Sequence, residues 1–492
     1  YAPRQTVAAE GELAPLAVAR VIAARLGDPR IGARLEALPA PAQAATPAIA
    51  RVPHFCAGCP HNRSTAVPDG SLALAGIGCH SLALWKPGSR TMTLTHMGGE
   101  GANWVGLAPF VATPHMFQNM GDGTYYHSGL LAIRAALAAG TPITFKILVN
   151  DAAAMTGGQP VEGRPTAAAI ARQLVAEGVE RVALVGEEMP SGASGPGVSV
   201  HRRDELDAVQ RELRAFRGVS AIVYDQVCAT EKRRRRRRRE LPAPAVRPFI
   251  NTLVCEGCGD CVQQSGCVAV LPVDTPFGRK RRIDAAACNV DLSCLAGFCP
   301  SFVTVEGGTP RRRDVPLPDA FAQLPEPATA ALDAPVNLLV AGVGGSGVIT
   351  VGALLGMAAH LERKAALVLD NTGLARKGGA VATHVRVARR ADELHAARID
   401  AAQADVLLAC DLIVAATPAM LGAIAPGRTR VVANAHPTLT AAQLADPDAQ
   451  CDFGALETAL AAAAGADRQV ALDATALASA LSHLRAVLAS FQ

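Results

Sequence analysis

The chain has 492 residues, of which half are apolar and 4% aromatic, and its formal net charge is +4. This apolar content is enough to bury the cores of about three domains of ordinary size, which excludes a disordered protein. The chain opens on Tyr1 without a positively charged, apolar leader. We therefore expect no signal peptide, and we expect the sequence to be a fragment of a longer protein.

Residues 1–50 contain one helical pattern, LAPLAVARVIAARLGD, followed by an Ala/Pro-rich run, and we expect the tail of a preceding domain and a linker. From residue 51 to 230, short β-rich runs alternate with amphipathic helical patterns, which is typical of βαβ units on a parallel sheet. A basic run then extends from Lys232 to Arg239. Because adjacent arginines repel one another, residues 231–254 are predicted to form a solvated linker.

The rest of the chain contains a cysteine-rich segment over 255–308, a Pro/acid linker over 309–334 and a second α/β pattern over 335–492. The uncharged stretch 336–360 is long enough to cross a bilayer, but the glycine loop near its middle favours a strand, a turn and a helix. We expect neither a membrane nor a nucleic-acid partner. The chain has thirteen cysteines, seven of them within 255–299. Such close spacing is typical of cluster ligands and not of a disulfide scaffold, so we expect a reducing cytoplasm.

The stretch NMGDGTYYHSG places one acid, Asp122, between Gly121 and Gly123 ahead of a helical segment. The run ILVND then ends at Asn150, so both polar residues are expected at the carboxyl ends of neighbouring parallel strands, where open α/β sheets bind ligands. Such oxygen donors suit Mg²⁺ that also holds phosphate oxygens. The two glycines would let a diphosphate approach the backbone at a helix N-terminus. The alternative is an ordinary turn.

The Gly-Asp-Gly turn followed by Asn150 resembles the thiamine-diphosphate signature. With THMGGEGANWVGLAPF and ILVNDAAAMTGGQP, it resembles the thiamine domain of the 2-oxoacid:ferredoxin oxidoreductases, most closely the indolepyruvate:ferredoxin oxidoreductases in their fused, single-chain bacterial form. This resemblance implies that Mg²⁺ and thiamine diphosphate are bound by Asp122, Asn150 and the main-chain oxygen of Ala152. It also implies a cofactor or substrate pocket lined by His96, Gly98, Gly99, Glu100 and Thr156. As alternatives, Glu100 is a surface acid and His96 an ordinary satisfied polar residue.

The cysteine-rich segment contains two runs with the spacing of a two-cluster ferredoxin. One tight loop with C-x₂-C-x₂-C holds three corners of a cubane, and the last cysteine of each run completes the other cluster. The first cluster site is therefore expected to be Cys255, Cys258, Cys261 and Cys299. The second is expected to be Cys267, Cys288 and Cys294, with Asp291 at the remaining iron or with that iron missing. Because oxygen binds iron less tightly than sulfur does, we expect this cluster to interconvert between three-iron and four-iron forms. A Cys₄ zinc site is the alternative.

Four further cysteines lie in the first α/β region: Cys56, Cys59, Cys79 and Cys228. Their order is similar to that of the cysteines that hold a cluster beside the thiamine in pyruvate-oxidising relatives, which implies a third cluster site. Free thiols are the alternative, since CPH stands where those relatives have CGE. Cys410 and Cys451 are expected to be ordinary small apolar residues.

In the last region, Gly342, Gly344 and Gly347 fit a dinucleotide fingerprint between a strand and a helix. However, the acid expected about twenty residues on is poorly placed, because the strand AALVLD ends at Asp370, about thirty residues on. The loop and DNTGLARKGGAVATHVRVA resemble instead the γ domain of the same family, which packs over the thiamine site without nicotinamide. The expected fold class is α/β, with a thiamine-binding parallel-sheet domain, a small ferredoxin-like segment and a Rossmann-like γ-type domain.

The resemblance implies a thiamine-diphosphate-dependent enzyme that decarboxylates an aryl 2-oxoacid, indole-3-pyruvate by preference, with coenzyme A, and passes electrons through its clusters to ferredoxin. The activating glutamate of such enzymes would precede residue 1, and the C-terminus LSHLRAVLASFQ stops short of the usual end. We therefore expect the chain to need that region or a partner subunit, and to be a homo-oligomer. Basic GRKRRID could attract an acidic carrier or form a solvated loop. The alternatives are an electron-transfer subunit without thiamine chemistry and a nicotinamide-dependent reductase.

Overall fold

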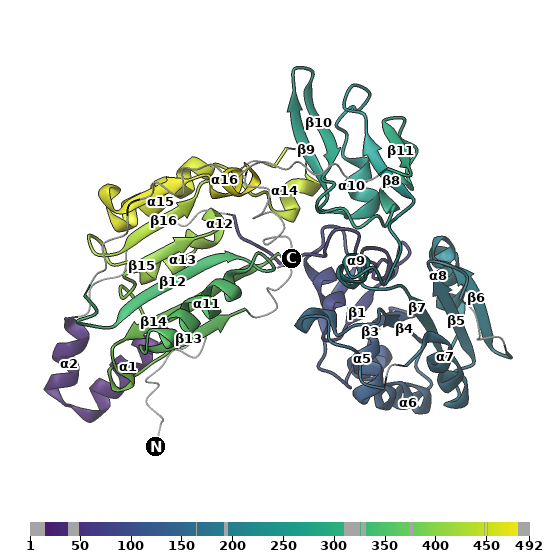
Figure 1. Cartoon of the computed structure of the whole chain (residues 1–492). Helices are drawn as coiled ribbons and strands as arrows, with labels where there is room; N and C mark the ends of the chain where they lie inside the picture. Colours follow the sequence, from purple (N-terminus) through teal and green to yellow (C-terminus); the bar gives the residue numbers. More distant parts are fainter. Residues whose placement is uncertain are drawn as a thin grey trace. The chain divides into compact units, whose positions relative to one another are not determined.

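The computed structural model describes residues 15–37, 49–163, 165–190, 195–308, 325, 331–372, 378–446, 448–449 and 451–480. Their helices and strands, drawn in Figure 1, belong to two compact units. The first unit comprises Tyr1–Arg51, Arg313–Thr438 and Cys451–Gln492, and the second comprises Val52–Arg312 and Leu439–Gln450. Most of the linker expected over 309–334 and the C-terminal LSHLRAVLASFQ lie outside the described residues.

A seven-stranded sheet, parallel throughout, forms the centre of the second unit, which confirms the expected βαβ pattern. Its order is β2-β1-β3-β4-β7-β5-β6. The strands are β1 (Ala73–Ala75), β2 (Thr91–Leu94), β3 (Met116–Gly121), β4 (Ile143–Val149), β5 (Arg181–Gly186), β6 (Val198–Arg202) and β7 (Val219–Asp225). Strand β4 is buried along its whole length, and β5 is buried except at Arg181, because helices cover both faces of the sheet. One face packs against α4 (Ala102–Leu107), α6 (Leu130–Ala139) and α7 (Ala167–Ala176), and the other against α8 (Leu206–Ala215).

A lysine, Lys146, lies in the middle of β4 and is fully buried. Its Nζ donates hydrogen bonds to Gln210 Oε1 at 2.6 Å and to the main-chain oxygen of Ala66 at 2.9 Å. It also lies over the ring of Phe117, 5.7 Å from the centroid. None of these partners carries a negative charge, so burial lowers the pKa of Lys146 to about 7.

This buried amine predicts a pH dependence of stability. Between about pH 7 and 10.5 the unfolded chain keeps the proton of Lys146 while the folded chain has lost it, so the free energy of unfolding should rise with pH. Below that window both states are protonated and the contribution is constant. We expect Lys146→Met to flatten the rise by on the order of 1 kcal/mol per pH unit. Urea unfolding at several pH values measures it, with the partly exposed Lys364→Met as control; equal slopes in both variants would contradict the prediction.

The cysteine-rich segment is built from two antiparallel strand pairs. β8 (Val246–Ile250) pairs with β11 (Phe302–Glu306), and β9 (Val270–Thr275) forms a hairpin with β10 (Gly278–Ile283). The alternative of a solvated loop for GRKRRID is therefore wrong, because most of it is strand β10. Two short helices complete the segment: α10 (Asp260–Ser265) and α14 (Ala441–Ala445), which arrives from late in the chain.

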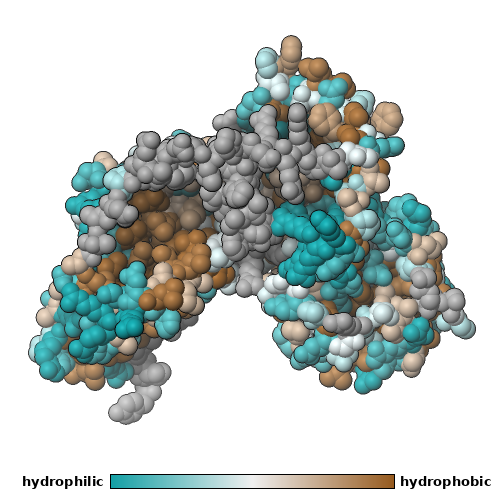
Figure 2. All heavy atoms as spheres, viewed as in Figure 1, coloured by the Kyte–Doolittle hydropathy of each residue, from teal (hydrophilic) through white to brown (hydrophobic). Residues whose placement is uncertain are grey.

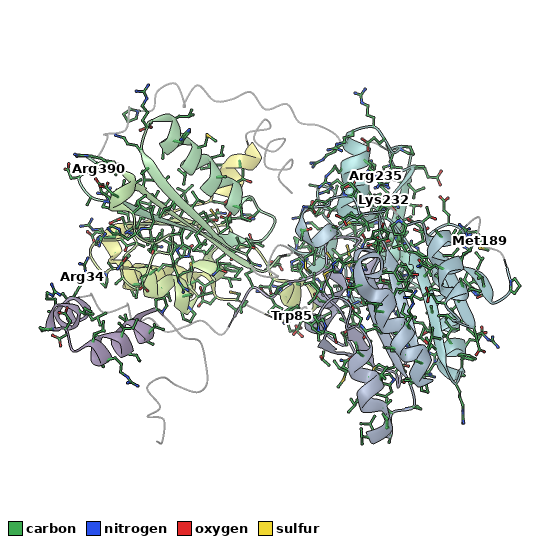
Figure 3. The ribbon with its side chains drawn as sticks, turned by 90° about the horizontal axis from the view of Figure 1, so that it is seen from below. Arg34, Trp85, Met189, Lys232, Arg235 and Arg390 are labelled. Atoms are coloured by element: carbon green, nitrogen blue, oxygen red, sulfur yellow. The ribbon has the colours of Figure 1, made fainter. Side chains whose placement is uncertain are left out.

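The prediction of a solvated linker is wrong for the first part of the arginine run, because residues Ala229–Arg237 form helix α9. Figure 2 shows hydrophilic side chains gathered over α9, and Figure 3 labels Lys232 and Arg235 on it. Acceptors from distant parts of the chain offset the repulsion. Arg234 donates to the main-chain oxygens of residues 157 and 158, Arg235 pairs with Asp151 at 3.1 Å, and Arg236 donates to the main-chain oxygen of residue 289. The helix thus joins the loop after β4 to the cysteine-rich segment.

The first unit contains a six-stranded mixed sheet in the order β13-β14-β12-β15-β16-β17. Its strands are β12 (Val336–Val343), β13 (Ala365–Asn371), β14 (Ala380–Ala388), β15 (Val406–Ala409), β16 (Arg430–Asn434) and β17 (Gln469–Leu472). Helix α11 (Val348–Leu361) packs on one face, whereas the core on the other face includes residues of α12 (Leu412–Ala415), α13 (Pro418–Ala423) and α15 (Phe453–Ala464). The stretch 336–360 is therefore strand, turn and helix as predicted. Within the described ranges, every helix is too short or too polar for a membrane crossing.

Residues before 52 belong to this first unit, although the sequence predicted the tail of another domain. They form α1 (Pro15–Leu26) and α2 (Pro29–Glu36). Asp28 caps α2, since its carboxylate accepts the main-chain N–H of Arg30 at 2.9 Å. Arg51 forms a buried ion pair with Asp411, with 2.6 Å between Nη2 and Oδ2. The contact is invisible in the sequence because the two residues are 360 positions apart.

Candidate functional site

The carboxyl edge of the parallel sheet contains a topological switch point. From β1 the chain moves outward to β2 and then returns to the opposite side of β1 as β3, so the strand order reverses between β1 and β3. Open α/β sheets bind ligands in the crevice outside the strand ends at such a point. β1 ends at Ala75 and β3 at Gly121, which brings residues 76–80 and Asp122 to this crevice.

Asp122 and Asn150 lie side by side after β3 and β4, as the sequence predicted. Asp122 Oδ2 accepts the main-chain N–H of Asn150 at 3.0 Å, and Oδ1 accepts that of Gly123 at 2.8 Å. The side-chain oxygen of Asn150 accepts the N–H of Ala152 at 3.2 Å. Burial raises the pKa of Asp122 to about 6, which reflects a carboxylate held out of water without a cation beside it. A divalent cation bound here would remove that penalty.

Three buried polar atoms near the switch point have no hydrogen-bond partner among the described residues: Glu100 Oε1, His80 Nε2 and Asn119 Oδ1. Gly76 is next to all three residues. Its N–H donates to the main-chain oxygen of Asn119, its Cα faces the Glu100 carboxylate, and its main chain hydrogen-bonds His80. Burial raises the pKa of Glu100 and lowers that of His80 to about 4. Unpartnered buried polar atoms are rare in native proteins, so these three atoms are available to hydrogen-bond a bound water, ion or polar ligand. The surface alternative for Glu100 is wrong, since it is fully buried.

The other predicted pocket residues are placed unequally. Gly98 has φ +88°, and a Cβ there would lie 2.7 Å from Ser128 Oγ, so this position favours glycine. A Cβ on Gly99 would lie 2.7 Å from the His96 ring. His96 is exposed beside this glycine. Thr156 is also exposed, and its hydroxyl lies 2.8 Å from Gln159 Oε1 and 3.1 Å from the main-chain oxygen of residue 153, either of which accepts its proton. The structure therefore groups Glu100 with the crevice but leaves Thr156 on the surface of the following loop.

Sequence reasoning missed His80 and Asn119. The signal was available only in part: His80 follows Cys79, a predicted cluster ligand, and Asn119 precedes the Gly-Asp-Gly turn by two residues. Neither position indicates that the side chain is buried, without a partner and close to the switch point.

The four cysteines of the third cluster site gather in one place. Burial, then the neighbouring thiols of Cys56, Cys228 and Cys79, raise the pKa of Cys59 well above its usual value. Cys228 also donates its main-chain N–H to the main-chain oxygen of Asn150 at 3.0 Å. The third cluster site therefore adjoins the Asp122–Asn150 pair.

The first and second cluster sites gather as the crossed ferredoxin pattern predicts. Burial, opposed by Arg281 and reinforced by the other cysteines of the first cluster site, raises the pKa of Cys261 to about 11. Burial, followed by Cys267 and Cys288, raises the pKa of Cys294 to about 12. All thirteen cysteines of the chain are free thiols.

Across the described residues, no three His, Cys, Asp or Glu side chains are placed to hold a single metal ion. The buried thiols need an anion-stabilising ion or cluster to lose their protons.

Asp291 lies next to the second cluster site but is held by residues that follow strands β6 and β7 of the seven-stranded sheet. Its Oδ1 accepts hydrogen bonds from Arg203 at 2.7 Å and from Gln226 at 2.9 Å, and Oδ2 accepts one from Ser293. Burial, and then the nearby thiol of Cys288 and carboxylate of Asp291, raise the pKa of Cys267. Because both oxygens already have donors, an iron would have to compete with an ion pair. The exchange between three-iron and four-iron forms stays a prediction, to be tested by electron paramagnetic resonance before and after iron reconstitution.

The third and second cluster sites touch through Gly58. This glycine lies between Cys56 and Cys59, and its N–H donates to the thiol of Cys267. It has φ +65°, and a Cβ would lie 3.1 Å from the Cβ of Asp291.

We expect Gly58→Ala to destabilise the second unit by about 1–2 kcal/mol for the left-handed backbone and roughly 1–3 kcal/mol more for the close contact. Gly70→Ala is the matched control, since Gly70 has φ +75° but open space around it. Thermal unfolding of both variants measures the difference. Equal losses of stability would show that Asp291 does not pack tightly against Gly58.

The glycine loop of the first unit lies between β12 and α11 as expected, with φ +93° at Gly345 and +97° at Gly347. However, β12 has two neighbours in the sheet, the antiparallel β14 and the parallel β15, and β13 pairs only with the far edge of β14. Asp370, near the end of β13, accepts a hydrogen bond from Thr383 at 2.7 Å. In the dinucleotide-binding fold the ribose-binding acid follows the next strand of the chain, which lies parallel beside the loop strand. Here the next strand, β13, is separated from β12 by β14, and Asp411, which follows the parallel neighbour β15, is paired with Arg51. This arrangement disfavours the reductase alternative.

Comparisons with known proteins agree with these observations. Residues 337–489 match the family model described as pyruvate ferredoxin/flavodoxin oxidoreductase. The indolepyruvate oxidoreductase subunit IorA of Thermococcus kodakarensis is 26% identical over 269 residues, or 51% of this chain and 40% of that protein. IorA of Archaeoglobus fulgidus is 29% identical over 265 residues, or 51% of this chain and 39% of that protein. The chain therefore spans less than half the length of these relatives.

Among solved structures, a 2-oxoglutarate:ferredoxin oxidoreductase from Magnetococcus marinus matches 38% of this chain and 67% of its own. The identity is 17% and the TM-score 0.29.

Proposed function

From its matches to the family model and to the IorA subunits, we propose that the chain is a 2-oxoacid:ferredoxin oxidoreductase and that it takes part in the oxidative decarboxylation of an aryl 2-oxoacid. Indole-3-pyruvate is the proposed substrate, because the curated relatives are named indolepyruvate oxidoreductase subunits. With coenzyme A the products are an acyl-CoA, CO₂ and two electrons, which pass through iron–sulfur clusters to ferredoxin. In this proposal residues 51–230 bind thiamine diphosphate and residues 255–308 bind two clusters. Residues 335–492 correspond to the γ domain of the family.

One observation carries the proposal: the third cluster site adjoins the Asp122–Asn150 pair at the switch point, through the hydrogen bond from Cys228 to the main-chain oxygen of Asn150. Thiamine diphosphate, when bound, supplies the electron sink that decarboxylation requires. In the proposal, Asp122, Asn150 and the main-chain oxygen of Ala152 hold Mg²⁺, and Gly121 and Gly123 leave room for the diphosphate.

The buried polar atoms of the crevice have proposed roles beside the cofactor. Glu100 keeps one oxygen on the N–H of Gly98, at 2.7 Å, which orients its free oxygen. His80 and Asn119 offer further hydrogen-bonding atoms inside the crevice. His96 and Thr156 are both exposed. They are proposed to contact the substrate only once the substrate is bound and covers the crevice. Since the relatives are subunits, activity is proposed to require a partner chain.

The test is a count of iron, sulfide and thiamine on anaerobically purified chain, followed by calorimetric titration with thiamine diphosphate with and without Mg²⁺. We expect Mg²⁺-dependent binding and about eight to twelve irons per chain for two or three cubanes. Turnover of indole-3-pyruvate, pyruvate and 2-oxoglutarate with coenzyme A, a dye acceptor and the partner subunit then ranks the substrates. Iron without thiamine binding would favour the electron-transfer alternative, and zinc in place of iron would overturn the proposal.

A further inference from the structure

A buried arginine lies beside the first cluster site. Arg281 is on β10, opposite Pro272 of β9, and only 1% of it is exposed. Its neighbours in the same basic run, Arg279 and Arg282, are exposed. Because side chains alternate across a strand, Arg281 points to the opposite face from Arg282. Arg279 shares the face of Arg281 but lies next to the hairpin turn, where it pairs with Asp274.

The contacts of Arg281 are incomplete for a cation. Its main-chain N–H donates to Cys255 Sγ at 3.4 Å, and Nη1 donates to the main-chain oxygen of Leu444 at 3.0 Å. Nη2 has no partner in the part of the chain that the structure describes, where no carboxylate pairs with the guanidinium either. Nη2 lies beside Gly259, in the loop of Cys258 and Cys261, because a Cβ built on Gly259 would lie 3.4 Å from it.

A buried guanidinium without an anion is strongly unfavourable, since its desolvation is not offset by any Coulombic attraction. The cysteines of the first cluster site supply that anion once they hold a cluster, because four thiolates leave an iron–sulfur cubane with a net negative charge. Reduction adds one more negative charge at the same place. A fixed cation in a dry environment stabilises that added charge, which raises the reduction potential.

We propose that Arg281 is the internal counter-cation of the cluster at Cys255, Cys258, Cys261 and Cys299, and that it raises the reduction potential of this cluster. The inference rests on the proposed function in that it takes an iron–sulfur cluster to occupy the first cluster site. Arg281 acts as a positioning residue. It contacts the loop that carries the cluster-binding cysteines and acts on the cluster electrostatically, and it contacts no substrate.

The experiment is a redox titration of the reconstituted full chain, followed by electron paramagnetic resonance, for wild type, Arg281→Met, Arg281→Lys and Arg282→Met. We expect Arg281→Met to lower the ratio of reduced to oxidised cluster at least tenfold at a fixed potential, which is about 59 mV for one electron. Arg281→Lys keeps the charge and should keep most of the potential. Arg282→Met, one position away on the exposed face, should leave the potential unchanged.

Thermal unfolding gives a second measurement that does not depend on electron transfer. Arg281→Met removes an unpaired buried charge, so the cluster-free protein should melt at a higher temperature than wild type, while the gain on reconstitution should shrink. A role limited to holding Leu444 would instead lower the melting temperature with and without iron. Loss of the cluster from Arg281→Met but not from Arg281→Lys would also support the charge, whereas loss from both would overturn it.

The failure of this inference is distinct from that of the proposed function. If wild type takes up no iron at the first cluster site, the proposed function fails first. If it loads a cluster whose potential is the same in Arg281→Met and wild type, only the role of Arg281 is overturned.

Discussion

Replacing Asp122 by asparagine is expected to abolish Mg²⁺-dependent binding of thiamine diphosphate. The carboxylate already accepts the N–H groups of Gly123 and Asn150, which orient its remaining lone pairs towards the switch point. Asparagine retains one acceptor and the volume but removes the charge. Because a ligand to the metal is lost, the decrease in affinity should exceed the roughly 10–100-fold typical of outer partners.

Calorimetry with and without Mg²⁺ measures this loss on the full chain. The matched control is Asp151→Asn, since Asp151 adjoins Asn150 in sequence but pairs with Arg235 and has 46% of its side chain exposed. We expect the control to bind the cofactor within a few-fold of wild type. Undiminished binding by Asp122→Asn, or an equal loss in both variants, would show that the metal does not lie at this strand end.

Cys261→Ser is expected to remove about four irons per chain and the matching electron paramagnetic resonance signal of one cubane. Cys261 is buried, and the other three cysteines of the first cluster site are close enough to raise its pKa. Serine binds iron much less readily because its hydroxyl is not ionised near neutral pH. The third and second cluster sites, which use other cysteines, should keep their iron.

Iron and sulfide analysis after anaerobic reconstitution measures this effect. Cys410→Ser is the matched control, because Cys410 is an exposed cysteine of the first unit. The control should bind as much iron as wild type. If Cys261→Ser lowers the iron content no more than Cys410→Ser, the grouping of Cys261 with Cys255, Cys258 and Cys299 is wrong.

The sequence by itself determined the features that depend on near neighbours. Alternation of apolar runs and helical patterns predicted the parallel sheet, and the positions of Asp122 and Asn150 after their strands followed from it. Ligand spacing predicted which cysteines gather at the first and second cluster sites, since three thiolates on one loop are constrained by that loop. The strand, glycine turn and helix over 336–360 followed in the same way.

The tertiary structure decided what depends on partners far along the chain. Repulsion within the arginine run predicted a linker, but acceptors on the loop after β4 and near residue 289 make it helix α9. In the basic run GRKRRID, Arg281 is buried whereas Arg279 and Arg282 are exposed. The sequence does not show this difference, which depends on the pairing of β10 with β9. Segment 439–450 leaves its sequence neighbours to pack on the cysteine-rich segment.

The switch point illustrates the same division most clearly. Each strand end was visible locally, yet no local pattern tells that β3 returns beside β1, which brings Glu100, His80 and Asn119 to one crevice. Strand order is set by the burial of whole faces and by chain crossovers, and these are properties of the assembled sheet. Residue type and spacing therefore specify which groups are chemically able to act, and the packing of distant segments specifies which of them meet.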